Sequence, residues 1–304
     1  MKNNEEAVYR FYRDRLRSNF DIGDRLDETG YDLTLFAQQG NPYSDQPEHI
    51  FEDHDGIFHI QSPFASYRIS SEQRRIWVEY DDDESVRSTI FHLPAAALAM
   101  GEGNLLLHAS ALYTNGRVIA FCGPKGMGKS TLISLLGQFS PIFSDDTMFL
   151  SERDSQVCAY AQAGRLRLTK ETCQIHSSNP CLYEDAPKSI QGKAYMNASE
   201  IGAQPYVASG NTVPILSTIV VIHRHVSPDF RIRPVDSLLE KTSLLMANCI
   251  GILFLTTQSR KRLCTGKTFQ QVLSTVRFLH LYLPNRLACL KTQSPQIFAS
   301  ILSA

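Results

Sequence analysis

Residues 123–130 are the segment of this chain whose spacing points most directly to chemistry. They read Gly-Pro-Lys-Gly-Met-Gly-Lys-Ser and fill each position of the Gly-x-x-x-x-Gly-Lys-Ser pattern of phosphate-binding loops. The glycines let backbone N–H groups turn inward toward a β-phosphate, and a following helix would add the positive end of its dipole. We therefore predict a nucleotide site made of Gly123, Pro124, Lys125, Gly126, Met127, Gly128, Lys129, Ser130 and Thr131.

Three side chains at the end of this loop have distinct expected roles. Lys129 is placed to reach the β- and γ-phosphates, Ser130 to bind Mg²⁺ and Thr131 to contact the α-phosphate. ATP and Mg²⁺ are the expected cofactors, although the pattern does not distinguish ATP from GTP. The alternative is a glycine-rich turn that arose by chance, or a loop that has lost its nucleotide.

Two adjacent carboxylates, Asp145 and Asp146, follow the loop. Asp146 stands 17 residues after Lys129 (146 − 129 = 17), beyond one expected helix and one short strand. At a strand end near a γ-phosphate, one carboxylate could hold Mg²⁺ while the other accepts a proton from an attacking hydroxyl. The spacing does not assign these two roles, and it also fits a Walker B aspartate with an idle neighbour.

His108 is the third candidate, in the apolar run Leu-Leu-Leu-His-Ala-Ser. We expect a strand over 105–113, a tight turn at Asn115-Gly116 and a second strand over 118–122 that enters the loop. The strand feeding the loop is therefore one arm of a hairpin, whereas in doubly wound sheets it follows a helix. His108 could hydrogen-bond an aspartate and orient it, or it could be a packed histidine without a function.

The strand with His108, the hairpin, the loop, a helix expected over 131–139 and the Asp pair together resemble the HPr kinase/phosphorylase-like kinases. His108 stands 21 residues before Lys129 (129 − 108 = 21), which is the separation in that family. The resemblance covers about residues 94–150 and implies an α/β P-loop kinase core of the HPr kinase/phosphoenolpyruvate carboxykinase type. It implies His108 as the residue that orients the base, Lys129 as the phosphate lysine, Ser130 as a magnesium ligand, Asp146 as the general base and Asp145 as its partner near the metal.

The segment from Leu93 to Ser110 is similar to a compact subgroup of these kinases, which is encoded with peptide natural-product pathways. Its members modify the ribosomal precursors of lasso peptides and carry a β-rich N-terminal lobe. Strands expected over 57–60, 65–69 and 75–80 fit such a lobe. We therefore expect a β-rich lobe over residues 1–93 and an HPr-kinase-like nucleotide-binding core over residues 94–304.

The other expected elements follow from local patterns. Apolar residues in 7–20 suggest a helix, alternation around Gly164 suggests a hairpin over 157–170, and 171–210 shows little regular structure. Further expectations are a strand over 214–222, a helix capped by Asp236 and ending near Asn248, a helix over 269–281, a strand over 287–290 and a terminal helix opened by Pro295.

Composition excludes several classes of protein. The 304 residues carry a formal charge of −1, so nothing steers the whole molecule toward nucleic acid or a membrane. No run of eighteen apolar residues predicts a transmembrane helix, and the first residues do not resemble a signal peptide. The seven cysteines show no Cys-x-x-Cys spacing and fit the reducing cytoplasm.

The leading functional hypothesis is an ATP-dependent serine kinase that acts on a peptide or protein, with a C-terminal serine of a lasso-peptide precursor as the suggested acceptor. Arg165, Arg167 and Lys193 would line a groove and meet the peptide carboxylate, although each also fits ordinary solvated surface. The alternatives are an ATP-binding regulatory switch without phosphotransfer and a small-molecule phosphotransferase related to phosphoenolpyruvate carboxykinase. The sequence leaves phosphorylase activity and oligomeric state, a homo-oligomer included, undetermined.

Overall fold

The computed structural model divides the chain into two compact units. Unit 1 comprises Met1–Leu106, Phe149–Ser151 and Cys249–Gln270, and unit 2 comprises Leu107–Met148, Glu152–Asn248 and Gln271–Ala304. The structure describes residues 7–18, 25–26, 32–40, 49–61, 65–161, 166–176, 182–189, 192–207, 213–252 and 255–304. The mixture of helices and strands expected from the sequence is present, and the expected boundary between residues 93 and 94 stays a prediction.

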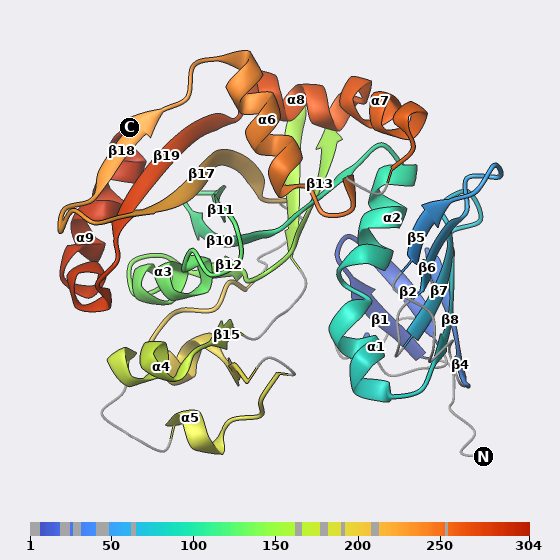
Figure 1. Cartoon of the computed structure of the whole chain (residues 1–304), viewed down its shortest axis with the longest axis horizontal. Coiled ribbons are helices and arrows are strands. Elements are labelled where there is room, and N and C mark those ends of the chain that lie inside the picture. The colour runs from blue at the N-terminus through green and yellow to red at the C-terminus, as the bar shows by residue number, and fades with distance from the viewer. Residues whose placement is uncertain are drawn as a thin grey trace. The chain divides into compact units, whose positions relative to one another are not determined.

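Unit 1 is built on one mixed sheet (Figure 1). Its strands run in the order β3-β1-β2-β4-β8-β7-β6-β5. Their bounds are Ala7–Phe11 (β1), Asp14–Ser18 (β2), Arg25–Leu26 (β3), Leu33–Gln39 (β4), His49–Glu52 (β5), Phe58–Gln61 (β6), Ala65–Ser70 (β7) and Arg75–Tyr80 (β8). Strands β6, β7 and β8 confirm the three expected from the sequence. In β6 and β8, buried and less buried residues alternate, as in a sheet with one covered face.

The helix expected over residues 7–20 is wrong, because β1 and β2 form an antiparallel hairpin there. The chain reverses at Tyr12, whose φ of 55° lies in the left-handed region. Tyr12 holds this conformation through its hydroxyl, which donates to the Phe91 carbonyl oxygen at 2.9 Å, and through ring contacts with Phe11 and Phe91. Tertiary packing has therefore overridden a short apolar pattern that fits a helix equally well.

Two helices complete the core of unit 1. Helix α1 spans Asp83–Thr89 and contacts β8, and α2 spans Leu93–Gly101 and contacts β6 and β7, on one side of the sheet (Figure 1). The alanines of α2 are almost fully buried, which lets the helix approach the sheet closely. Helix α7, Thr257–Thr265, also belongs to this unit.

Unit 2 contains a second mixed sheet, which carries the phosphate-binding loop. The strands β12-β10-β11-β17-β14 are neighbours in that order, β19 pairs with the other end of β17, and β18 pairs with β19. Their bounds are Ala109–Thr114 (β10), Arg117–Cys122 (β11), Ile142–Ser144 (β12), Gln156–Ala161 (β14), Ile215–His225 (β17), Arg231–Pro234 (β18) and Arg277–Pro284 (β19). The chain passes between the units at β9, Leu105–Leu107, and at β13, Met148–Arg153.

The expected hairpin before the loop is confirmed. Strands β10 and β11 are antiparallel, and Asn115 and Gly116 at their turn have φ values of 50° and 79°. Two positive φ values are what a two-residue turn of this twist requires. The run expected as one strand over 105–113 is interrupted at His108, which separates β9 from β10. Strand β11 then runs parallel to β17, so both end at the edge of the sheet where the loop begins.

Helices cover both faces of this sheet (Figure 1). Helix α3, Lys129–Leu136, and helix α9, Leu287–Ser303, pack together on the face that presents Phe121, Ile222 and Leu281. Helix α6, Leu238–Asn248, lies over the other face, where its Glu240 reaches His280. Successive residues of β19 thus face opposite helix layers, α3 with α9 on one side and α6 on the other. The phosphate-binding loop lies at the ends of the strands, between these two layers.

Two expectations for the middle of the chain are wrong. Strand β15, Leu166–Leu168, pairs with β16, Ala194–Met196, and so forms no hairpin with β14; Gly164 itself lies outside the described residues. The stretch 171–210 contains regular structure: helix α4 over Lys170–His176, helix α5 over Leu182–Asp185 and a 3₁₀ helix over Ala198–Ile201. The pairing of β15 with β16 joins residues far apart in the chain, such as Leu166 and Met196, so it leaves no local pattern in the sequence.

The last third of the chain departs from expectation in four places. The segment expected as one helix over 269–281 divides into α8, Lys267–Thr275, and β19. The strand expected over 287–290 is the start of α9, which continues through Pro295. Proline lacks the N–H that the Lys291 carbonyl needs, and the Ser294 hydroxyl donates to that oxygen at 2.9 Å. Helix α6 is preceded by Ser237, whose hydroxyl accepts the Glu240 N–H, so Asp236 is not the cap.

Candidate functional site

The loop over residues 123–128 has a backbone that only glycine adopts easily. Gly123 and Gly128 have φ values of 142° and 89°. A Cβ on Gly123 would approach the Ile222 carbonyl oxygen to 3.1 Å, and one on Gly128 would collide with the Arg224 guanidinium. Gly128 immediately precedes α3, so the loop ends at a helix N-terminus, where free N–H groups and the dipole favour an anion. The loop therefore fits a phosphate in shape and in charge.

Lys129 is the first residue of α3, and its side chain turns back into the loop. Its Nζ donates to the Gly123 carbonyl oxygen at 2.7 Å, and only 7% of the residue is exposed. Burial lowers the pKa of Lys129, while Cys122 and the two aspartates act in the opposite direction. The ammonium group is thus held at the centre of the loop, where a phosphate oxygen could replace the carbonyl as its partner.

Two side chains outside the motif fix the loop in place. The Arg224 Nε on β17 donates to the Met127 carbonyl oxygen at 3.0 Å, and its guanidinium also reaches the Pro284 carbonyl at 2.7 Å. At the other end of the loop, the Asn248 side-chain oxygen accepts the Gly123 N–H at 2.9 Å. Both ends of the loop are therefore held by the surrounding fold, and the pattern of the loop sequence gives no sign of either contact.

Asp145 lies at the end of β12 and accepts three hydrogen bonds. Its Oδ1 accepts the hydroxyls of Ser130 at 2.9 Å and Ser110 at 2.6 Å, and its Oδ2 accepts the Arg167 backbone N–H at 3.0 Å. Ser130 and Asp145 thus bring a hydroxyl and a carboxylate oxygen together beside the loop, as a Mg²⁺ site with nucleotide phosphates requires. Among the described residues, no group of three or more His, Cys, Asp or Glu could hold a metal. Phosphate oxygens would have to complete the coordination.

Asp146 has an unusual backbone and two cationic neighbours. Its φ of 81° is uncommon outside glycine and costs on the order of 1–3 kcal/mol, so the surroundings must hold it there. Its carboxylate pairs with the Arg167 guanidinium through Oδ2, and the His108 Nε2 lies 3.5 Å from Oδ1. The neighbouring carboxylates therefore face different partners: Asp145 faces hydroxyls at the loop, and Asp146 faces His108 and Arg167.

The structure gathers the residues singled out in the sequence. Lys129, Ser130 and Asp145 meet at the loop, and Asp146 meets His108 at the strand break. The Thr131 hydroxyl, expected near an α-phosphate, lies 3.0 Å from the Thr172 hydroxyl.

The three basic residues expected to line a groove differ in what the structure says of their positions. Arg165 lies outside the described residues. Arg167 stands on β15 and is paired with Asp146, and Lys193 is near enough to Lys129 for its charge to lower the Lys129 pKa. Sequence reasoning missed Ser110, Arg224 and Asn248. Ser110 alone carries a signal, because it stands two residues after His108 and would share its face in the single strand expected over 105–113.

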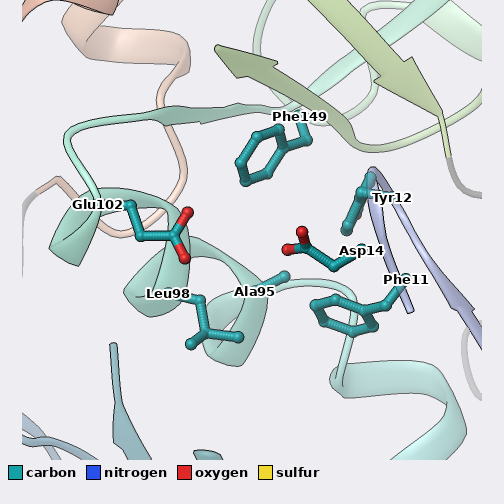
Figure 2. A pocket seen from close by; sticks show the side chains of 7 residues that line it. All are labelled: Phe11, Tyr12, Asp14, Ala95, Leu98, Glu102 and Phe149. Carbon is teal, nitrogen blue, oxygen red and sulfur yellow. The ribbon is translucent and has the colours of Figure 1, made fainter. Parts of the chain in front are cut away.

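A cavity in unit 1 is unrelated to this chemistry (Figure 2). It is lined by Phe11, Tyr12, Asp14, Ala95, Leu98, Glu102 and Phe149. Figure 2 shows the carboxylates of Asp14 and Glu102 on its wall. Both are neutralised, because Arg74 pairs with each of them and Arg13 also pairs with Glu102. The cavity is therefore a structural feature of the unit 1 core.

Comparisons with known proteins place few constraints on this chain. No protein-family model matches it, and no curated protein matches it. Among solved structures, the chain is similar to the Hpr(Ser) kinase/phosphatase from Coxiella burnetii, with 10% sequence identity and a TM-score of 0.33 over 65% of this chain and 97% of that chain. Similarity at this level supports no conclusion about activity. Within the described residues, no helix is long and apolar enough to cross a membrane.

Proposed function

We propose that this protein is an ATP-dependent kinase that transfers the γ-phosphoryl group to a serine hydroxyl of a peptide or protein. The observation that carries the proposal is the different surroundings of two adjacent carboxylates beside a phosphate loop. The Oδ1 of Asp145 accepts a hydrogen bond from the Ser130 hydroxyl, and the Asp146 carboxylate lies between His108 and Arg167. Phosphoryl transfer needs these two functions, one at the metal and one at the attacking hydroxyl.

The residues at the metal side would be Ser130 and Asp145. They would hold Mg²⁺, which would supply positive charge opposite the negative charge that develops on the transferring group. Lys129 would act on the same phosphates from within the loop, where its Nζ already lies. Ser110 and the Arg167 N–H would keep the Asp145 carboxylate in position through their hydrogen bonds. The loop and its supports thus bind and orient the nucleotide.

Asp146 would act as the general base. Its carboxylate takes the proton of the serine hydroxyl, the serine oxygen forms a bond to the γ-phosphorus, and the bond from that phosphorus to the β,γ-bridging oxygen breaks, releasing ADP. His108 at 3.5 Å would keep one carboxylate oxygen oriented, and Arg167 would hold the other until a substrate approaches. The strained φ of Asp146 fits a residue that is positioned for chemistry.

The suggested acceptor is a serine at or near the C-terminus of a ribosomal precursor, such as that of a lasso peptide. The motive is the resemblance of residues 93–110 to the kinases of those pathways, together with the positive charges of Arg167 and Lys193 near the site. A terminal carboxylate would make charge-assisted hydrogen bonds with such groups.

A regulatory switch that binds ATP without chemistry is the second candidate. It would use the loop, Lys129 and Ser130 in the same way, but it has no need of a base or of a residue that orients one. The environment of Asp146 favours the kinase over the switch. A small-molecule phosphotransferase would keep the base and replace only the acceptor.

Product analysis separates these functions. The protein is incubated with ATP, Mg²⁺ and a mixture of serine-containing peptides, small alcohols and small acids. Four products are then separated: ADP, phosphopeptide, phosphorylated small molecule and free phosphate. Phosphopeptide that forms with equimolar ADP is the expected result. ATP that is bound but not consumed would favour the regulatory switch. Phosphate transferred only to a small molecule would favour the small-molecule phosphotransferase.

A further inference from the structure

One row of side chains crosses the outward face of the unit 1 sheet. Phe36 on β4 is the register partner of Trp77 on β8, and Trp77 is the partner of Arg68 on β7. Arg68 is in turn the partner of His59 on β6, and His59 of Phe51 on β5. Register partners lie on the same face of a sheet. The five residues, which we call the aromatic row, therefore form a continuous line across neighbouring strands.

The members of the aromatic row also contact one another. The rings of Phe36 and Trp77 are stacked with centroids 6.3 Å apart, and the Arg68 guanidinium carbon lies 4.7 Å from the centroid of the Trp77 ring. At the other end, the Phe51 and His59 rings are stacked at 4.6 Å with an angle of 5° between their planes. Such stacking orders the side chains in advance, which lowers the entropy cost of binding a partner.

The two ends of the aromatic row are exposed aromatic side chains. Phe36 is 39% and Phe51 is 36% exposed, whereas Ile69 and Ile76, which point to the opposite face, are fully buried. The helices α1 and α2 cover that opposite face. Single exposed apolar residues are common, but exposed aromatic side chains gathered on one face of a sheet indicate a candidate interaction surface.

The chemistry of the row selects among classes of partner. Trp77 already stacks with Phe36 and carries the Arg68 guanidinium over its ring, so it is not an open aromatic platform of the kind on which nucleic-acid bases stack. Arg68 is exposed, and no carboxylate in the described part of the chain pairs with it. The row therefore places the rings of Phe36 and Trp77 on one side of the Arg68 charge. The rings of His59 and Phe51 lie on the other side, where the Nε2 of His59 is paired with the Asp53 carboxylate at 2.9 Å.

We propose that the aromatic row is a docking site for an extended peptide segment with one acidic side chain between apolar ones. Five strands at a spacing of about 4.8 Å give a row of about 19 Å, which about six residues of extended chain would span. The acidic side chain would pair with Arg68, and apolar side chains on either side would contact Trp77 with Phe36 and His59 with Phe51. This docking is independent of phosphoryl transfer, and its test needs no nucleotide.

Trp77 makes the test direct, because it is the single tryptophan of the chain and lies within the row. The probes are ten-residue synthetic peptides with Glu, Gln or Lys at one central position and Leu or Ile two positions to each side. Titration is followed by tryptophan fluorescence and, independently, by calorimetry. We expect the Glu peptides to bind at least about tenfold more tightly than the matched Lys peptides, which corresponds to about 1.4 kcal/mol.

Charge reversal gives the decisive comparison. Arg68→Glu should abolish or invert the preference for Glu over Lys, and Phe36→Ser should weaken every peptide equally. Arg117→Glu makes the same charge change at an exposed position of unit 2 and should have no effect. Arg68→Lys keeps the positive charge and should retain the preference for Glu over Lys peptides. This variant provides the comparison if thermal melts show that Arg68→Glu is unstable.

Four results would overturn the proposal. The first two concern the peptides: none binds at millimolar concentration, or the Glu and Lys peptides bind with equal affinity. The third is peptide binding that survives in both Arg68→Glu and Phe36→Ser. The fourth is concentration-dependent self-association of the protein that these two substitutions abolish. The last would make a second copy of the chain the occupant of the row. A fluorescence change with oligothymidine but with no peptide would assign the surface to nucleic acid and would equally contradict docking of a peptide.

Discussion

The side-chain oxygen of Asn248 accepts the backbone N–H of Gly123, the first residue of the phosphate loop, at 2.9 Å. The same residue accepts the His108 N–H through its own backbone carbonyl, also at 2.9 Å. Its side-chain nitrogen donates to the Leu244 carbonyl oxygen one turn earlier in α6, which fixes the orientation of the amide. One residue at the end of α6 thereby ties the nucleotide loop to the strand break that carries His108.

Asn248→Leu should weaken nucleotide binding through the loop. The buried Gly123 N–H would lose its partner, a loss of about 1–3 kcal/mol, and ATP affinity should fall by about tenfold or more. Asn248→Asp keeps the acceptor oxygen and should lose less. Calorimetric titration with ATP and Mg²⁺ measures both. Ser243→Ala at an exposed position of α6 is the control, and equal affinities for Asn248→Leu and this control would contradict the positioning role.

Asp146→Asn should abolish the base while leaving the shape of the site intact. We expect phosphoryl transfer to fall by roughly 10²–10⁴, the usual range for a positioned acid–base group, while ATP binding persists. Asp145→Asn should instead reduce the affinity for Mg²⁺, because Asp145 faces Ser130. The rate of transfer and the dependence on Mg²⁺ concentration are measured for both variants. If Asp145→Asn loses transfer at saturating Mg²⁺ and Asp146→Asn does not, the two roles are reversed.

His108→Ala should lower the rate of transfer less than Asp146→Asn does. Its ring lies 3.5 Å from the Asp146 carboxylate and would orient that group without taking the proton itself. We expect a loss of about tenfold, or 1.4 kcal/mol, with unchanged ATP affinity. His54→Ala, at a histidine whose side chain is 89% exposed, is the matched control. Loss of folding in His108→Ala, seen by circular dichroism, would show that the histidine is needed for packing.

Lys129 should make the free energy of unfolding depend on pH in a predictable direction. Burial lowers its pKa in the folded chain below the usual 10.5. Between that lowered pKa and 10.5 the unfolded chain holds more protons, so stability rises with pH across this window. Wild type should therefore gain stability relative to Lys129→Met as the pH is raised toward 10.5. Urea unfolding at several pH values measures this, with Lys125→Met at the exposed loop position as control. A difference that falls with pH would refute the assignment.

The sequence was most informative where a short local pattern determines the backbone. The glycines of 123–128 and the turn at Asn115-Gly116 need positive φ values, and the structure has them. Strand and helix patterns were less reliable where tertiary contacts decide. The turn at Tyr12 depends on Phe91, which is 79 residues away. The run from Lys267 to Leu283 contains a helix and then a strand with no glycine or proline between them.

The site shows the same division between local and long-range information. Lys129 and Ser130 belong to one motif and could be found by spacing alone. Asn248 comes to Gly123 from 125 residues along the chain, and Arg224 comes to Met127 from 97. Neither residue type is unusual in its surroundings, so only the fold identifies them. The aromatic row likewise depends on the register of five strands, which a single sequence does not determine.

The most direct test of the kinase proposal is the mass of a peptide after incubation with this protein, ATP and Mg²⁺. Three matched peptides are compared: one with a C-terminal serine, one with the serine inside the chain and one with a C-terminal alanine. The proposal predicts a gain of one phosphate on serine peptides, greatest for the terminal serine, and no gain with Lys129→Ala or Asp146→Asn. Equal labelling of both serine peptides would remove only the terminal carboxylate from the account. ATP that binds tightly and labels no peptide, or labelling undiminished in Lys129→Ala, would contradict it.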